Sequence, residues 1–257
     1  MTANGSLVVA PARDRQELAQ FRARTEGHQL VDATELARLE PELMGRFQQG
    51  LFYPQEAHVE PAAAMAFLLH AIRRLGGDVA LGCSSAEVQG DVTIDCRGIG
   101  ASRDLKALRG VRGERAIVQA DGIALRRPVR LLHPRHRLYV VPWSGGTYMV
   151  GATMLETDDS GPVTVRSTLD LMGLAYTLCP ALGEGRVLSL DAGIRPAFPD
   201  NLPRISVEDD TIRVNGLFRH GFLLAPVLAL LVAEYLETGC REPAWLFLGP
   251  RAALQRH

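Results

Sequence analysis

Two arginines near the C-terminal end of the sequence are the first residues that could do chemistry. Arg195 stands in a Gly-Ile-Arg-Pro run. Arg219 stands in Gly-Leu-Phe-Arg-His-Gly, directly before an apolar segment that predicts a helix from about Phe222 to Thr238. A guanidinium can grip a carboxylate through two parallel hydrogen bonds, and a helix N-terminus favours negative charge because its first N–H groups are unpaired. The stretch predicts an anion-binding site, although an arginine before a proline is by itself more often a surface or salt-bridge residue.

Tyr139 is a second candidate for contact with a substrate. It lies in a predicted strand, Leu138–Val141, and its phenol could give a further hydrogen bond to the same carboxylate. From the residues alone, a half-buried strand tyrosine without a binding role is an equally good interpretation. The run Cys96–Ser102 contains Gly98 and Gly100 and predicts a turn at the exit of a strand, most simply an ordinary turn.

Composition and charge limit the function classes. A formal net charge of −1 leaves no basic surface for nucleic acid, and a hydrophobic fraction of 47 % is normal for a globular enzyme. The four cysteines lie far apart with no C-x-x-C pair, which argues against a metal site or a disulfide framework and fits the reducing cytosol. The longest apolar run, Phe222–Ala233, has 12 residues including a proline. Because a membrane span needs about 20 residues, we expect a buried helix and no membrane partner.

The order of the predicted elements favours an α/β (α+β) chain. Helices are predicted over Asp14–Thr25, Thr34–Leu39, Glu60–Leu75 and Val165–Leu178. From Gly110 onward, short strands alternate with turns, which is typical of an antiparallel sheet with hairpins. The other predicted strands include Ser6–Ala10, Gly50–Pro54, Val79–Leu81, Val92–Cys96, Arg115–Gln119, Val129–His133, Thr147–Gly151, Val187–Asp191 and Thr211–Val214, and Trp245 and Phe247 are expected to dock the C-terminal tail.

The two arginine motifs also support a resemblance. Gly-Ile-Arg-Pro-Ala-Phe-Pro-Asp-Asn-Leu-Pro, followed by Phe-Arg-His-Gly-Phe-Leu-Leu-Ala-Pro, resembles the C-terminal signature of the glycine oxidase/D-amino-acid oxidase family of FAD enzymes, with the glycine oxidases of thiamine biosynthesis as the nearest branch. The resemblance implies oxidation of a small amino acid to its imine with FAD. Molecular oxygen would reoxidise the flavin, and the imine would serve thiazole formation or hydrolyse to glyoxylate.

The resemblance also implies roles for particular residues. Arg195 and Tyr139 match the family residues that bind the substrate carboxylate, and Met154 matches a residue lining a small substrate pocket. Arg219 matches the arginine in the segment beside the flavin and is expected to contact the substrate as well. The sequence departs from the family pattern at Leu217, His220 and Trp143, where histidine, asparagine and a basic residue are usual, so substrate selectivity is open. The residues expected to lie against FAD are Gly98, Gly100, Ala101, His220, Gly221, Phe222, Leu223 and Leu224.

Enzymes of this family normally begin with a strand, a G-x-G-x-x-G turn and a helix that hold the FAD pyrophosphate. The sequence contains no such motif, so we expect the remnant of an FAD-binding Rossmann-like domain, lacking its first nucleotide-binding block, beside a substrate domain with a mostly antiparallel sheet. A fragment, a mis-assigned start and a natural remnant remain open. The predicted boundaries are 1–57 and 104–190 for the substrate domain, 58–103 and 191–240 for the FAD-binding part, and 241–257 for a tail.

Two alternatives remain beside a glycine oxidase. One is an oxidase of sarcosine or D-amino acids, and the other is an inactive, flavin-free remnant or interaction module. We expect a cytoplasmic protein that acts on a small amino acid and oxygen and that could form a homo-oligomer. Because a missing first block would leave the apolar faces of Glu60–Leu75 and Phe222–Glu237 partly uncovered, we also expect the chain to self-associate.

Overall fold

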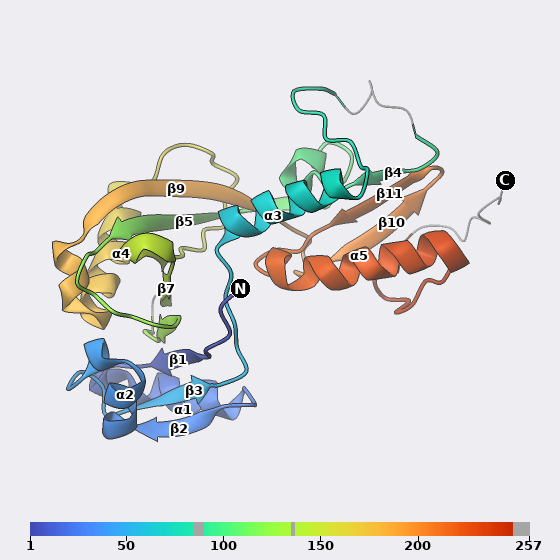
Figure 1. Cartoon of the computed structure of the whole chain (residues 1–257). Helices are drawn as coiled ribbons and strands as arrows, with labels where there is room; N and C mark the ends of the chain where they lie inside the picture. The colour runs from blue at the N-terminus through green and yellow to red at the C-terminus, as the bar shows by residue number, and fades with distance from the viewer. Residues whose placement is uncertain (85–89, 135–136, 249–257) are drawn as a thin grey trace. The chain divides into compact units, whose positions relative to one another are not determined.

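The computed structural model describes residues 1–84, 90–134 and 137–248, and we treat its two compact units separately (Figure 1). The first unit comprises Met1–Leu81, Glu114–Thr153 and Gly161–Ala192. The second comprises Gly82–Gly113, Met154–Ser160 and Gly193–His257. Residues 249–257 of the predicted tail lie outside the described residues. The assignment of a substrate domain and an FAD-binding domain stays a prediction.

An eight-stranded sheet has the order β2-β3-β1-β6-β7-β8-β5-β9. Strand β1 pairs with β6 in parallel, and the pairs β1–β3, β2–β3, β6–β7, β7–β8 and β5–β8 are antiparallel. The strands are β1 (Ser6–Val9), β2 (Gln29–Asp32), β3 (Gln49–Tyr53), β5 (Arg109–Gln119), β6 (Val129–Leu131), β7 (Leu138–Pro142), β8 (Thr147–Gly151) and β9 (Arg186–Ala197). The predicted antiparallel pairing is confirmed for β6–β7, β7–β8 and β5–β8, whereas β1 pairs with β6 in parallel.

Side-chain caps define the start of two helices in the first unit. Asp32 accepts hydrogen bonds of 2.9 Å from the N–H groups of Thr34 and Glu35 at the start of α2 (Ala33–Leu39). Thr164 accepts a 3.2 Å bond from the N–H of Ser167 at the start of α4 (Val165–Leu178), so both helix ends satisfy unpaired donors. The other helices of this unit are α1 (Arg15–Ala23) and α3 (Pro61–Arg74).

The apolar core of the first unit lies between its sheet and the helices α2 and α4. Its fully buried members alternate along the strands, as period-2 patterning requires. They include Leu7, Leu36, Val129, Leu131, Val140, Val150, Leu171 and Leu178.

The second unit is built on a four-stranded sheet with the order β12-β10-β11-β4. Its strands are β4 (Thr93–Asp95), β10 (Arg204–Glu208), β11 (Thr211–Asn215) and β12 (Phe247–Leu248). One side of helix α5 (Gly221–Thr238) packs on this sheet through Leu228, Val232 and Tyr235. Gly239 ends α5 with φ 76°, a conformation that glycine adopts without strain.

Two apolar helices are much less covered than their composition predicts. No residue of α3 is buried, and Phe67 is 70 % exposed. In α5, Leu230 is 70 % exposed and only 17 % of the 18-residue helix is buried, at a mean hydropathy of 1.6. The expectation of a buried helix therefore holds for one face of α5 only. By length and composition alone α5 could also cross a membrane, which is weak support for such a role because core helices share these properties.

A few local expectations need correction. Val79–Leu81 forms no strand. The turn predicted after the Val92–Cys96 strand is confirmed, as a single 3-10 turn at Gly98–Ala101. Trp245 is 61 % exposed, whereas Phe247 is buried and its ring lies 5.9 Å from that of Tyr235. Only one of the two tail aromatics therefore docks in the described chain, because Trp245 precedes β12 and only the inward side of that strand meets the core.

Candidate active site

Arg195 lies near the end of β9, in the second unit, and is half-buried. Its guanidinium lies directly against the main chain of Gly113, in β5. A Cβ atom at Gly113 would lie 2.0 to 2.2 Å from Nη2, Cζ and Nη1 of Arg195. Arg195 can therefore hold this position only because residue 113 has no side chain.

The segment after Arg195 is joined to the segment before Arg219. The N–H of Phe218 donates a 3.0 Å hydrogen bond to the carbonyl oxygen of Pro196. The Nδ2 atom of Asn215 donates a 2.8 Å bond to the carbonyl oxygen of Gly98. A Cβ atom at Gly98 would lie 3.6 Å from the ring of Pro196. The structure thus brings together the predicted flavin-side turn and both arginine motifs.

The start of α5 is open to an anionic group. His220 is the residue before the helix and makes no side-chain cap, and a Cβ atom added to Gly221 would meet no atom within 4 Å. The first intrahelical bond runs from the N–H of Leu224 to the carbonyl oxygen of His220, at 2.8 Å. The N–H groups of Gly221, Phe222 and Leu223 therefore remain available as donors.

Arg219 extends this open surface. It is exposed and makes no hydrogen bond or ion pair with the part of the chain that the structure describes. His220 is also exposed. An uncapped helix start beside a guanidinium fits the electron-rich edge of a flavin ring, where negative charge develops on reduction. The sequence contains no G-x-G-x-x-G loop for the pyrophosphate, so the fit concerns the flavin end of FAD.

A cluster of the charged residues Asp95, Arg97 and Asp104 flanks the turn at Gly98–Ala101. Asp95, 8 % exposed, accepts hydrogen bonds from the Arg97 guanidinium at 2.7 and 3.0 Å and from the Arg97 N–H at 3.0 Å. The hydrogen bonds from Arg97 lower the pKa of Asp95, against the effect of its burial. Arg97 also contacts Asp104 at 2.6 Å. The cluster closes the loop that presents Gly98, Gly100 and Ala101, of which Ala101 is buried and Gly100 exposed.

Met154 begins a short segment of the second unit, Met154–Ser160, and is 53 % exposed. Arg112 holds this segment. Its N–H lies 2.9 Å from the carbonyl oxygen of Leu155, and its guanidinium donates a 2.6 Å bond to the carbonyl oxygen of Asp159. Arg112 is 1 % exposed. Sequence reasoning missed it because a charged residue in a strand is normally placed on the solvent face.

Tyr139 lies in the first unit, on β7, opposite Gly151 of β8. Its ring lies 3.7 Å from the position of a Cβ at Gly151, and the side chain is half-buried. Trp143 directly follows β7 and packs against Arg115, whose guanidinium lies 5.8 Å from the ring centroid. The joint action of Tyr139 with Arg195 of the second unit stays a prediction.

Glu114 is a buried acid that sequence reasoning missed. It is 0 % exposed, and the Thr153 hydroxyl donates a 3.0 Å hydrogen bond to its Oε2 atom. The N–H of Glu114 in turn donates a 2.9 Å bond to the Thr153 hydroxyl oxygen. The alternation of β5 gives a usable signal, since Glu114 occupies an inward position between Arg112 and Ala116, which are both buried.

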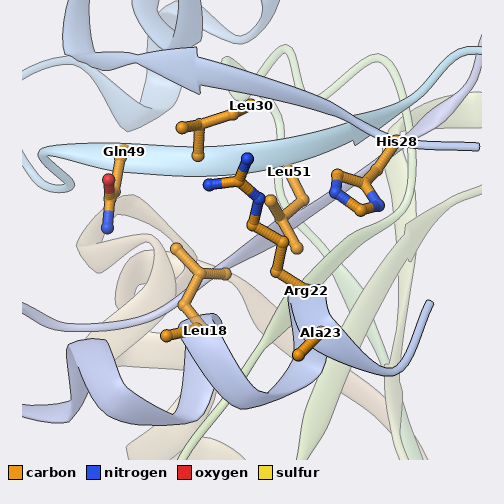
Figure 2. A pocket seen from close by; sticks show the side chains of 8 residues that line it. Leu18, Arg22, Ala23, His28, Leu30, Gln49 and Leu51 are labelled. Atoms are coloured by element: carbon orange, nitrogen blue, oxygen red, sulfur yellow. The ribbon is translucent and has the colours of Figure 1, made fainter. Parts of the chain in front are cut away.

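A cavity of about 390 Å³ lies elsewhere in the first unit, between α1 and the strands β2 and β3 (Figure 2). It is lined by Leu18, Ala19, Arg22, Ala23, His28, Leu30, Gln49 and Leu51. None of the residues predicted to bind substrate or flavin lines it. Within the described ranges, no group of three or more His, Cys, Asp or Glu side chains is placed to hold a metal ion.

The uncapped start of α5 beside Arg219 and the glycine-containing turn linked to it suit the flavin end of FAD. The chain belongs to the FAD dependent oxidoreductase family called DAO, whose family profile matches residues 1–235. The family depends on FAD, and the relatives of this chain are of the glycine oxidase and ThiO type.

Three relatives illustrate this similarity. A Rhizobium etli protein named as a thiamine biosynthesis oxidoreductase, ThiO, is 48 % identical over 240 residues, which cover 93 % of this chain and 73 % of that protein. Glycine oxidase of Bacillus licheniformis is 26 % identical over 258 residues, covering 91 % of this chain and 69 % of the relative. The crystal structure of glycine oxidase from Geobacillus kaustophilus matches with a TM-score of 0.77 at 21 % identity, over 99 % of this chain and 75 % of that one. This structural match confirms the predicted fold.

Proposed function

We propose that this protein uses FAD to oxidise glycine, or a similarly small amino acid, to its imine. The imine hydrolyses to glyoxylate and ammonia or serves thiazole formation, and oxygen is reduced to hydrogen peroxide. The observation that supports the proposal most directly is the placement of Arg195 beside Pro196, whose carbonyl oxygen is hydrogen-bonded to Phe218 at the entry to α5. A carboxylate-binding cation and an anion-favouring helix start thereby belong to one connected piece of the second unit.

FAD, when bound, supplies the acceptor for the hydride that leaves the α-carbon of the substrate. The residues of the chain bind the substrate and hold it in one orientation. Arg195 would donate two parallel hydrogen bonds to the substrate carboxylate, and this pairing would fix the orientation of a small amino acid. Tyr139 would add one neutral hydrogen bond to the same group. The N–H groups of Gly221 and Phe222 stabilise negative charge at the edge of the α5 N-terminus.

The expected flavin contacts are the residues already placed at the two loops. The turn contributes Gly98, Gly100 and Ala101, and the start of α5 contributes backbone groups. Arg219 supplies a positive charge beside them. The residues of the α5 start are His220, Gly221, Phe222, Leu223 and Leu224.

The size of the substrate is proposed from Met154. By the resemblance Met154 lines the substrate pocket, where its long, flexible thioether would fill the space that the side chain of a larger amino acid needs. Glycine is favoured because two relatives bear the names ThiO and glycine oxidase. Sarcosine and D-amino acids are the competing substrates, and relative rates on glycine, sarcosine and D-alanine would rank them.

Two further proposals concern the setting of the reaction, and a third concerns assembly. A cytoplasmic location is proposed from the sequence, in which the four cysteines lie far apart with no C-x-x-C pair. Thiamine biosynthesis is supported by the name of the Rhizobium etli relative. A homo-oligomer is proposed from the resemblance, with size-exclusion chromatography coupled to light scattering as its test.

The proposed function is tested by incubating the purified chain with FAD, desalting it and recording the visible spectrum. A retained flavin spectrum, followed by glycine-dependent peroxide formation, is the expected result. A colourless protein would mean that the 257-residue chain does not hold FAD and is not by itself the enzyme. A yellow protein that yields no peroxide with glycine, but does so with sarcosine or D-alanine, would reassign the substrate.

A further inference from the structure

The Arg195 guanidinium lies against the backbone of Gly113. The three terminal atoms Nη2, Cζ and Nη1 would lie 2.0, 2.1 and 2.2 Å from a Cβ at Gly113. Carbon atoms of real side chains do not approach other atoms so closely, so the guanidinium occupies the space that any other residue type would fill. Gly113 belongs to β5 and has an ordinary strand conformation, so backbone strain does not explain the glycine.

The atoms that would collide are the far end of a long, flexible side chain. Arginine has several rotatable bonds, and its displacement costs little compared with a shift of β5 or β9. A side chain added at Gly113 should therefore move the Arg195 guanidinium and leave the two strands in place. The consequence falls on the position of the charge more than on the stability of the chain.

We propose that Gly113 is a positioning residue for carboxylate recognition, because its missing side chain creates the surface on which the Arg195 guanidinium rests. The inference rests on the proposed function, in which Arg195 binds the substrate carboxylate. It extends that function to a residue that does not touch the substrate. A bidentate pair depends on both distance and angle, so a displaced guanidinium binds a carboxylate poorly even though its charge is unchanged.

The test uses the FAD-loaded protein and acetate, a carboxylate that is not oxidised. Isothermal titration calorimetry should show acetate binding about 10- to 100-fold more weakly in Gly113→Ala than in the wild-type protein, the loss expected when charged hydrogen bonds of roughly 1.5–3 kcal/mol are misaligned. Gly193→Ala is the matched control, because it lies on the same strand as Arg195 and no atom lies within 4 Å of its Cβ position. Its acetate affinity should equal that of the wild type.

A double-mutant cycle separates positioning from a general structural effect. In an Arg195→Ala background, Gly113→Ala should change neither acetate binding nor the melting temperature further, because the colliding side chain is gone. Equal losses in both backgrounds, or wild-type acetate affinity in Gly113→Ala, would overturn the proposal.

The same cycle distinguishes failure of the proposed function. A small drop in melting temperature in Gly113→Ala, which disappears in the Arg195→Ala background, reports the packing of Arg195 on Gly113 without any ligand. If the melting temperatures show this coupling while the wild-type holoenzyme binds no acetate, the carboxylate role of Arg195 fails and the positioning role falls with it. If acetate binds and depends on Arg195 but not on Gly113, only the positioning role is overturned.

Discussion

The N–H of Phe218 donates a 3.0 Å hydrogen bond to the carbonyl oxygen of Pro196. This single main-chain contact joins the residue that follows Arg195 to the residue that precedes Arg219. Phe218 adopts φ 50°, a conformation that non-glycine residues rarely take without a reason. The chain thus turns sharply between β11 and α5 and presents the helix start next to the end of β9. Two motifs that are far apart in sequence therefore act as one local structure.

The first prediction concerns the binding of the substrate carboxylate by Arg195. Arg195→Ala should raise the KM for glycine about 100-fold or more while kcat falls less, because charged hydrogen bonds worth roughly 1.5–3 kcal/mol each are lost from substrate binding. Arg195→Lys should recover part of the affinity, since it keeps the charge without the planar fork. Steady-state peroxide assays measure both constants. Arg186→Ala, an exposed arginine on the same strand, is the control, and an unchanged KM in Arg195→Ala would remove this residue from the site.

The second prediction concerns Tyr139. Removing its hydroxyl in Tyr139→Phe should raise the KM for glycine about 3- to 10-fold, the effect of one neutral hydrogen bond of about 0.5–1.5 kcal/mol. The melting temperature should stay the same because the ring remains in the sheet. Tyr176→Phe, an exposed tyrosine on α4, serves as the matched control. Equal kinetics in both variants and the wild type would show that Tyr139 has only a packing role.

The elements were more predictable than their contacts. Helix α4 occupies the predicted range Val165–Leu178, because its apolar spacing and Thr164 cap are local signals. The packing of Arg195 on Gly113 depends on the register of β5 and β9, and no periodicity encodes that register. Arg112 was missed for a related reason, since its burial depends on carbonyl groups that are distant in the sequence. The exposed face of α5 was predicted only from the resemblance, as its apolar composition alone indicates burial.

The third prediction concerns Gly216, which has φ 78° and would place a Cβ 2.3 Å from Cδ2 of Phe198. Gly216→Ala should lower the free energy of unfolding by about 2–4 kcal/mol, from the strain of a left-handed residue and the collision with a buried ring. The collision is costly because Arg204 also packs on that ring, at 4.3 Å from its centroid. Urea unfolding followed by fluorescence measures the loss. Gly221→Ala, which meets no atom within 4 Å, should be neutral or stabilising, and equal losses in the two variants would contradict the packing argument.

The fourth prediction follows from the lowered pKa of Asp95. The hydrogen bonds from Arg97 lower this pKa in the folded protein, so the ionised form contributes stability above the unfolded value of about 3.9. That contribution is lost as the pH falls through the folded pKa. At pH 7 Asp95→Asn should melt about 2–4 °C below the wild type, and the difference should shrink as the pH is lowered below about 4. A gap that stays constant down to about pH 2 would show that the charge of Asp95 is not its cause.

The fifth prediction concerns the exposed apolar face of α5. Val227 and Leu230 are 46 % and 70 % exposed, and Phe67 on α3 is 70 % exposed. Exposed apolar patches of several hundred Å² are uncommon on monomers, so the 257-residue chain should self-associate in size-exclusion chromatography with light scattering. The double variant Val227→Gln/Leu230→Gln should shift the distribution toward the monomer without lowering the melting temperature. Leu169→Gln on α4, which replaces a leucine that is 67 % exposed, should not. A monomeric wild-type chain with a cooperative melt would contradict this prediction, and an equal shift in the α4 variant would assign the association to general hydrophobicity instead of α5.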